Sequence, residues 1–378
     1  MICIKNISKY KVETSIIIPI VLFALISVST IYSASSLLPS YMHNLYLKQF
    51  VWYVLGFGVA YAIMSIGNKI LHNSAYVLYV INVILLVLVL FFGKSVNNSR
   101  CWFDFGFFLL QPSEFMKVIL ILTLSRMIND YNNTYTNPSV DVELKFILKV
   151  MLVVLIPSAL TFVEPDTGAV LIYLFTTVVM MFVGGFRRRW FISLGGILLL
   201  FLGVLFGIYF INDDLFIKIF GTSFFYRIDR IINWSTGSGS QLTNSLIAIG
   251  SAGATGHGFN NTPIYFPELQ TDFIYGVFAS NYGFIGSISL IILFAYFDIS
   301  LINCSSKVYD STDKYTVIGI TAMLLFQQIW SLSMTVGLLP IMGITLPFIS
   351  YGGSSLLSYM FLVGIVFNIS NQSLRYTN

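Results

Sequence analysis

Few ionisable side chains interrupt this apolar chain, and the first that could support chemistry lie near residue 114. Gln111-Pro112-Ser113-Glu114 is typical of a helix start, and Lys117 follows three residues after Glu114. Residues three apart share a helix face, so we expect these two charges to pair. Charges within an apolar segment are costly and commonly functional, so we interpret the pair as part of a site. The alternative is an ion pair that only stabilises the helix end.

A second polar segment is the short turn Glu164-Pro165-Asp166-Thr167-Gly168. Two carboxylates this close together could bind a cation or a positively charged group of a substrate. Asp166 could equally cap the helix that follows, since aspartate is a favoured N-cap residue. The sequence leaves both interpretations open.

The third segment is long and polar, covering about 212–272, and carries Arg227 near its middle and Glu268 and Asp272 at its end. Arginine suits contacts with phosphate or pyrophosphate. A carboxylate where a polar loop meets an apolar helix can have its pKa raised by desolvation, which suits a general base. We therefore expect Asp272 to be a catalytic base, the alternative being a helix cap. His257, alone between glycines, is interpreted as structural.

The fourth segment, 337–355, is uncharged and rich in proline and glycine, and it contains Ser350, Gly352, Gly353 and Ser354. Non-helical backbone next to apolar helices is tolerated only where protein buries it or where it lines a water-filled cavity. This segment therefore belongs with the other three in a candidate site.

The elements that position these residues follow from composition. Hydrophobic residues make up 57% of the 378 residues and charged residues 10%, which excludes a cytosolic enzyme and a disordered protein. Scattered basic residues and a net charge of +4 give no support for nucleic-acid binding. Segments of about 20 apolar residues can cross a bilayer. The expected spans are 15–34, 50–67, 75–93, 113–128, 146–163, 168–186, 190–211, 273–297, 316–338 and 348–370.

The orientation follows from lysine and arginine, which favour the cytoplasmic side. Most of them, including the run Arg187-Arg188-Arg189, fall on the cytoplasmic side if the N-terminus is inside. We therefore predict an all-α polytopic membrane protein forming one domain over 1–378. Both termini are then cytoplasmic, and the loop at about 212–272, between the seventh and eighth helices, is outside. All four polar segments lie on that outer side.

The four segments together resemble the SEDS family (shape, elongation, division and sporulation), whose best-known members are RodA and FtsW. The resemblance covers nearly the whole chain. It is carried by Gln111-Pro112-Ser113-Glu114 with Lys117, by 165–168, by Pro267-Glu268 with Thr271-Asp272-Phe273-Ile274, and by 337–355. The chain departs from the family pattern at Ser280 and Asn281, where paired glutamates are usual, and at His257, where a lysine is common.

The resemblance implies a ten-helix peptidoglycan glycosyltransferase of the bacterial cytoplasmic membrane, which polymerises lipid II on the outer face. It implies a class B penicillin-binding protein as the transpeptidase partner, alongside lipid II and membrane lipids. The expected catalytic residues are Asp272, on which the family's essential aspartate falls, and Glu114 and Lys117, on which its helix-four acid and lysine fall. The expected substrate-binding residues are Arg100, Gln111, Asp166, Arg227, Glu268, Ser350, Gly352, Gly353 and Ser354.

The expected reaction needs a base for the acceptor hydroxyl and cations for the departing pyrophosphate. No cofactor is required by the sequence and no metal ligand set is evident; a divalent cation (Mg²⁺ or Mn²⁺) could share the second task. Short tails favour a RodA-like elongation role over an FtsW-like division role. The alternatives from other classes are a flippase for lipid-linked substrate and a non-catalytic scaffold. A flippase should carry polar residues through to the cytoplasmic face, whereas the polar segments here stay on the outer side.

Overall fold

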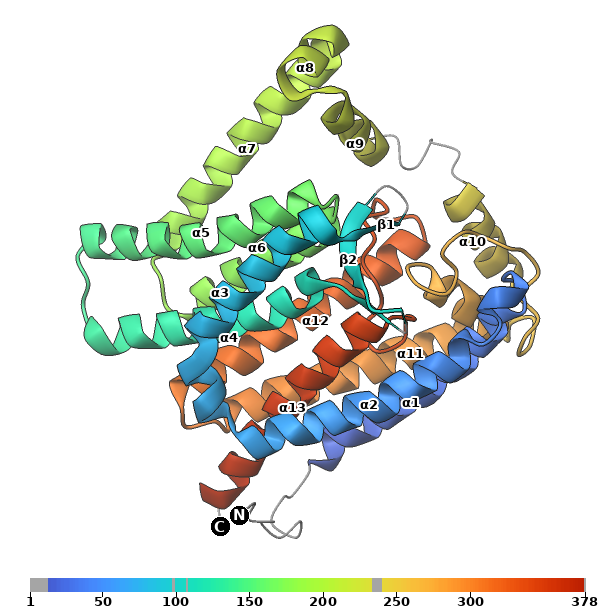
Figure 1. Cartoon of the computed structure of the whole chain (residues 1–378), viewed down its shortest axis with the longest axis horizontal. Coiled ribbons are helices and arrows are strands. Elements are labelled where there is room, and N and C mark those ends of the chain that lie inside the picture. The colour runs from blue at the N-terminus through green and yellow to red at the C-terminus, as the bar shows by residue number, and fades with distance from the viewer. Residues whose placement is uncertain (1–12, 97–98, 107, 233–239, 377–378) are drawn as a thin grey trace.

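The computed structural model describes residues 13–96, 99–106, 108–232 and 240–376. In this part of the chain, each predicted span corresponds to one long helix (Figure 1). These helices are α1 (Thr14–Ser35), α2 (Leu45–Ile66), α3 (Asn68–Phe92), α4 (Pro112–Thr134), α5 (Val140–Val163), α6 (Thr167–Val183), α7 (Arg188–Ile211), α11 (Ile274–Ser306), α12 (Ser311–Thr335) and α13 (Gly353–Tyr376).

The predicted span boundaries differ from the observed ones in several places. The eighth span continues to Ser306, and the last begins at Gly353 because the preceding residues form a loop. A 3₁₀ turn η2 (Ser40–Met42) precedes α2, and an antiparallel sheet of β1 (Lys94–Val96), β2 (Ser99–Asp104) and β3 (Leu109–Leu110) lies between α3 and α4. The predicted outer loop contains α8 (Asp213–Phe220), α9 (Thr222–Ile232) and α10 (Ser240–Ser251).

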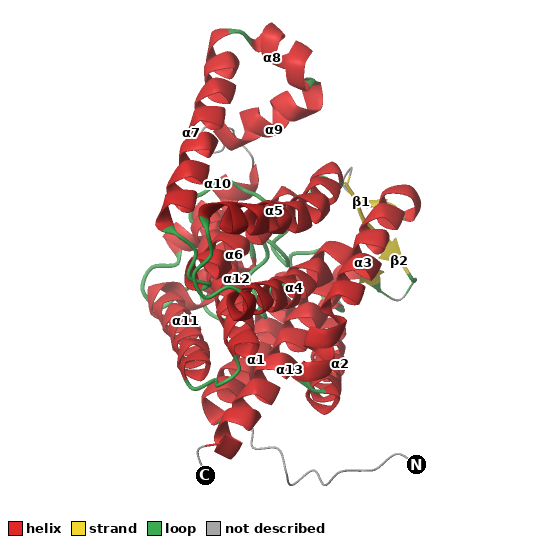
Figure 2. Cartoon of the chain, turned by 90° about the vertical axis from the view of Figure 1, so that its left-hand side faces the viewer, coloured by secondary structure: helices red, strands yellow, loops and turns green. Residues whose placement is uncertain are grey.

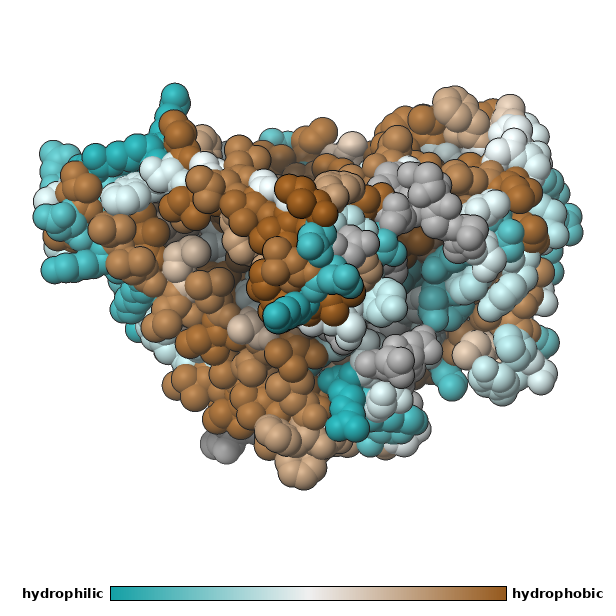
Figure 3. Space-filling model, turned by 90° about the horizontal axis from the view of Figure 1, so that it is seen from above, coloured by the Kyte–Doolittle hydropathy of each residue, from teal (hydrophilic) through white to brown (hydrophobic). Residues whose placement is uncertain are grey.

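The chain is an all-helical polytopic membrane protein. Among the described residues, eight helices are long and apolar enough to cross a membrane, and α6 is a shorter apolar helix. Figure 3 shows hydrophobic residues covering much of this face, with hydrophilic residues gathered toward its left and right ends and a smaller group near its centre. The start of α1 and the end of α13 lie at the same end of the bundle (Figure 1), as an even number of spans requires.

Helix α4 carries Glu114, Lys117 and Arg126, and it is enclosed by other helices rather than by lipid. It packs against α3, α6, α12 and α13, and most of its residues are buried. A span surrounded by protein can carry charges that a lipid-facing helix cannot. The weak hydropathy of this segment therefore reflects its central position.

Helix α11 breaks at Gly283, whose φ of 64° and ψ of −159° are outside the helical region. The freed amides of residues 284–285 donate to the carbonyls of residues 253–254, and the carbonyls of residues 280–281 accept from the amides of residues 257–258. The loop after α10 is therefore attached to α11 by four backbone hydrogen bonds. His257 takes part through its backbone and ring, in agreement with a structural role.

Helix α7 leaves the bundle and, with α8 and α9, forms an arm (Figures 1 and 2). The arm has its own small core around Leu205, Tyr209 and Phe216. Many apolar residues of α7 remain exposed; Leu199, for example, is 72% exposed. We interpret this exposed apolar surface as facing lipid, because exposing so many apolar side chains to water would be unfavourable.

Candidate functional site

The polar segments before α4, α6 and α13 meet through Gln111, which lies just before α4. Its side-chain amide donates to Asp166 Oδ2 at 2.9 Å, and its backbone N–H donates to Ser354 Oγ at 3.1 Å. Ser113 Oγ also donates to Asp166 Oδ2, at 3.0 Å. Ser354 Oγ in turn donates to the carbonyl of Leu109 at 2.6 Å. Three of the predicted substrate-binding residues, 111, 166 and 354, therefore form one cluster.

Asp166 caps α6, one of the two interpretations that the sequence left open, and its second carboxylate oxygen is bound by α4 and the residue before it. Its Oδ1 accepts from the backbone N–H of Ala169 at 3.1 Å, which caps α6, while Oδ2 faces α4. Burial raises the pKa of this carboxyl, and hydrogen bonds from Ala169 and Ser113 oppose the shift. The N-termini of α4, α6 and α13 converge here, and their positive dipole ends favour a negative charge.

Glu114 and Lys117 pair as their spacing predicts, with 2.7 Å between Lys117 Nζ and Glu114 Oε2. The Lys117 side chain is only 1% exposed and that of Glu114 11% exposed. Two residues of α13 complete the surroundings: Ser358 Oγ lies 3.5 Å from Glu114 Oε2, and the ring of Tyr359 lies 5.5 Å from Lys117 Nζ. Lys117 is thus enclosed and neutralised by Glu114, which makes it a supporting group rather than one that contacts substrate in this conformation.

Asp272 is half-buried in the turn that leads into α11. The turn is closed by Glu268, whose backbone has a positive φ of 57° and whose Oε2 accepts from Thr271 Oγ1 at 2.7 Å. The carbonyl of Glu268 also accepts from the amides of Thr271 and Phe273, each at 3.1 Å. Glu268 therefore holds the turn that carries Asp272 instead of pointing freely into solvent.

The loop between α12 and α13 connects Asp272 with the Asp166 cluster. A Cβ built on Gly343 would lie 3.9 Å from Asp272 Oδ2, and the φ of this glycine is +69°. Nearby, a Cβ built on Gly168 would lie 2.6 Å from the carbonyl oxygen of Met342. The absence of a side chain at residue 168 thus lets the loop pass directly over the start of α6.

Of the remaining predicted residues, Ser350 and Gly353 lie beside these two groups. Ser350 Oγ donates to the carbonyl of Thr271 at 2.7 Å, and Gly353 packs so closely on Trp52 that a Cβ would lie 2.6 Å from the indole. Arg100 is exposed on β2. Arg227 belongs to α9, but its side chain lies outside the part that the structure describes.

Glu164 is fully buried, and neither of its carboxylate oxygens has a hydrogen-bond partner. The thiol of Cys101 donates to the backbone carbonyl of Glu164, with 2.8 Å between Sγ and the oxygen. Burial and the nearby Asp166 raise the pKa of Glu164 to about 8. The second acid of the turn is therefore mostly protonated at neutral pH and is not a cation ligand in this geometry. In the described residues, no group of three His, Cys, Asp or Glu side chains could hold a metal ion.

The 346–352 segment is bound from α1 and α2 by three residues that the sequence alone did not predict, namely Ser27, Gln49 and Tyr53. A polar residue in or beside an apolar span was the available signal, and Gln49 gives it at the edge of the second span. The serine and tyrosine carry no such signal, because both are common in membrane helices.

The family model "Cell cycle protein", covering FtsW, RodA and SpoVE, matches residues 13–375. The chain is 34% identical to "Probable peptidoglycan glycosyltransferase FtsW" of Coxiella burnetii, with 88% of each chain covered. It is 30% identical to "Stage V sporulation protein E" of Bacillus subtilis, covering 97% of this chain and 99% of that protein.

Solved structures share the fold. A chain from a peptidoglycan synthase complex that coordinates polymerization and crosslinking superposes with a TM-score of 0.78 at 23% identity, covering 96% of this chain and 98% of that one. The rod shape determining protein RodA of Thermus thermophilus gives a TM-score of 0.69 at 24% identity, covering 95% and 96%.

Proposed function

Since the chain belongs to the FtsW/RodA/SpoVE (SEDS) family, we propose that it is a peptidoglycan glycosyltransferase that polymerises lipid II. The observation that carries this proposal is the placement of Asp272. It lies on a turn fixed by polar contacts, at the end of the bundle where α4, α6, α11 and α13 all begin. A carboxylate at such a boundary suits a base, and helix N-termini suit an anionic leaving group.

In the proposed reaction, Asp272 takes the proton of the acceptor sugar's 4-hydroxyl as that oxygen attacks the donor sugar and the pyrophosphate departs. Lys117 is enclosed, so the negative charge that develops on the pyrophosphate needs other cations. Arg100, exposed on β2, is the described candidate, and Arg227 is a second one. A divalent cation bound together with the substrate is a further possibility for this task.

Transport of a lipid-linked substrate is less well supported, because α13 carries an apolar stretch beneath the site. A polar cluster does exist at the opposite end, where His72 Nε2 and Asn68 Nδ2 lie 2.9 and 3.2 Å from Asp313 Oδ1. Between this cluster and the Glu114–Lys117 pair, residues 360–367 of α13 carry no polar side chain. Along this stretch, α13 offers a hydrophilic sugar no polar side chain to contact.

We also propose the cellular process in which the chain takes part. The relatives described above carry the names FtsW and SpoVE, which favours a role in division or sporulation. The RodA-like elongation role that the sequence suggested stays as the second candidate. Expression of the chain in a strain depleted of FtsW and in a strain depleted of RodA would separate the division role from the elongation role, since it should rescue only one of the two strains.

For the partner, we propose a class B penicillin-binding protein whose single transmembrane helix packs near α11 and α12. Exposed apolar residues such as Ile285, Ile292 and Ile299 recur every seven residues along α11, which gives a continuous stripe for a second helix. Co-purification from the native membrane tests this directly. Recovery of the chain without any such protein would count against the partner.

The decisive experiment is incubation of the purified chain, with its transpeptidase partner blocked by a β-lactam, with fluorescent lipid II. We expect glycan ladders from the wild type and none from Asp272→Asn, which can still cap a helix but cannot accept the proton. The expected loss is about 100- to 10,000-fold in rate. Near wild-type polymerisation by Asp272→Asn would exclude the base, and translocation in vesicles without ladders would favour the flippase.

A further inference from the structure

The segment 346–352 crosses the end of the bundle as a turn in which the N–H groups of Ile349 and Ser350 both donate to the carbonyl of Leu346. Three consecutive carbonyls of this loop, those of residues 348–350, instead have side-chain partners from other helices. Tyr53 Oη donates to the carbonyl of Phe348, Ser27 Oγ donates to that of Ile349 at 2.8 Å, and Gln49 Nε2 donates to that of Ser350 at 3.2 Å. All three donors come from α1 and α2, about 300 residues earlier in the chain. They form a donor row against one side of the loop.

Gln49 is at the centre of this row. Its Nε2 also lies 3.1 Å from Ser27 Oγ, and its Oε1 accepts from the backbone N–H of Gly352 at 3.4 Å. Gln49 and Ser27 are both 0% exposed, so water cannot replace these bonds. In such a place, an unpaired backbone carbonyl is strongly unfavourable, and the loop conformation therefore depends on the glutamine.

The same loop binds the turn that carries Asp272. Ser350 Oγ donates to the carbonyl of Thr271 at 2.7 Å, and the backbone N–H of Tyr351 donates to the carbonyl of Gln270 at 2.9 Å. The two residues immediately before Asp272 are thus held by the segment that Gln49 holds. The path from Gln49 to the residue before Asp272 passes through a single residue, Ser350.

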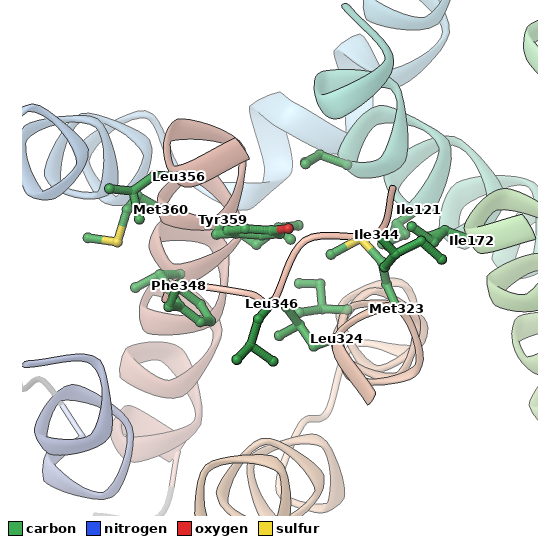
Figure 4. Close-up of a cluster of buried hydrophobic side chains, with 14 of the residues drawn as sticks. Ile121, Ile172, Met323, Leu324, Ile344, Leu346, Phe348, Leu356, Tyr359 and Met360 are labelled. Atoms are coloured by element: carbon green, nitrogen blue, oxygen red, sulfur yellow. The ribbon is translucent and has the colours of Figure 1, made fainter. Parts of the chain in front are cut away.

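Apolar contacts with the neighbouring helices also hold the loop between α12 and α13. Figure 4 shows Ile344, Leu346 and Phe348 of the loop lying among side chains of α12 and α13, including Tyr359. Phe348 is 2% exposed and has a positive φ of 65°, an unfavourable backbone conformation for a bulky residue. Such a conformation persists only where its surroundings enforce it, which the donor row and the buried ring do together.

We propose that Gln49 is a positioning residue for catalysis, which holds the 346–352 loop so that Asp272 faces the acceptor hydroxyl. This inference rests on the proposed function, because it concerns the geometry of the catalytic carboxylate. Gln49 is fully buried and bonds to Ser27, Ser350 and Gly352 rather than to the Asp272 turn, so its effect on the reaction passes through Ser350.

The test uses the full chain with its partner and measures initial polymerisation rates over a range of lipid II concentrations. Gln49→Glu keeps the size of the side chain and an acceptor for Gly352, but it has no N–H for the Ser350 carbonyl. Because displacement of a reacting group by about 1 Å can cost on the order of 100-fold, we expect kcat to fall at least about 10-fold with KM nearly unchanged. Ser27→Ala, which removes a neighbouring donor, should lower kcat in the same sense.

The matched control is Ser125→Ala. Ser125 is also 0% exposed, but its hydroxyl donates to the carbonyl of Ile121 within α4 and takes no part in the donor row. It should leave kcat and KM within about twofold of the wild type. Equal losses in Ser27→Ala and Ser125→Ala, or full kcat in folded Gln49→Glu, would overturn the proposal. If Gln49→Glu does not fold, Ser27→Ala alone decides by the same criterion.

A second readout does not require activity. With the three native cysteines replaced, the thiol of Asp272→Cys is labelled by a small charged methanethiosulfonate, with and without Ser27→Ala or Gln49→Glu. We expect either change to alter the labelling rate several-fold, and Ser125→Ala to leave it unaltered. A wild type that makes no glycan while labelling still shifts would refute the proposed function but retain the positioning. Unaltered labelling in both donor-row variants would refute the positioning itself.

Discussion

Lys117→Met removes the charge from the buried pair in α4 while keeping an unbranched side chain of similar length. The Lys117 side chain is 1% exposed and its Nζ lies 2.7 Å from Glu114 Oε2, so the variant leaves a carboxylate without its cation in a protein-enclosed site. Breaking a buried ion pair by removing one partner costs about 3–5 kcal/mol. Ser358, at 3.5 Å from Glu114, is too weak a donor to compensate.

The free energy of unfolding can be followed in detergent by circular dichroism during titration with sodium dodecyl sulfate. We expect Lys117→Met to be less stable by roughly that amount and to make little glycan. The double variant Glu114→Gln/Lys117→Met should recover most of the stability, because no charge is left unpaired. If the pair also supports the site, the stable double variant should stay below a tenth of wild-type activity. Unchanged stability of Lys117→Met would refute the reasoning, and full activity of the double variant would reduce the pair to a helix-end contact.

Three further predictions concern the turn, the loop and the orientation. The pKa of Glu164 rises from 4.5 to about 8 in the folded protein. The contribution of its protonated form to the free energy of unfolding should therefore be complete below pH 4.5 and be lost as the pH rises through 8. Glu164→Gln should therefore match the wild type in thermal unfolding at pH 5 and exceed it at pH 9; parallel pH profiles would contradict this. Gly168→Ala should displace the loop beside Asp272 and lower the polymerisation rate at least about 10-fold, whereas Gly196→Ala, with open space around its Cβ, should not; equal rates would contradict the close approach. Cysteines placed at Ser240 and Ser311 should react with an impermeant maleimide from opposite sides of the membrane, and reaction of both from the cytoplasm would reverse the orientation.

Local patterns in the sequence predicted the features that depend on near neighbours in the chain. Stretches of about 20 apolar residues located the spans, because length and hydropathy alone decide whether a helix can cross a bilayer. The spacing of Glu114 and Lys117 predicted their ion pair, since three residues place two side chains on one helix face. The aspartate of the 164–168 turn was recognised as a possible cap, and it caps α6.

Only the tertiary structure decided which helices are neighbours and what each loop contacts. Apolar helix faces pack equally well on lipid and on one another, so hydropathy did not reveal that α4 is enclosed or that α7 leaves the bundle. The bond between Gln111 and Asp166 and the one between Gln49 and Ser350 join residues 55 and 301 positions apart. Spacing along the chain carries no information about such pairs. They form because buried backbone and carboxylate oxygens must find donors, and only the packed bundle determines which donors lie within reach.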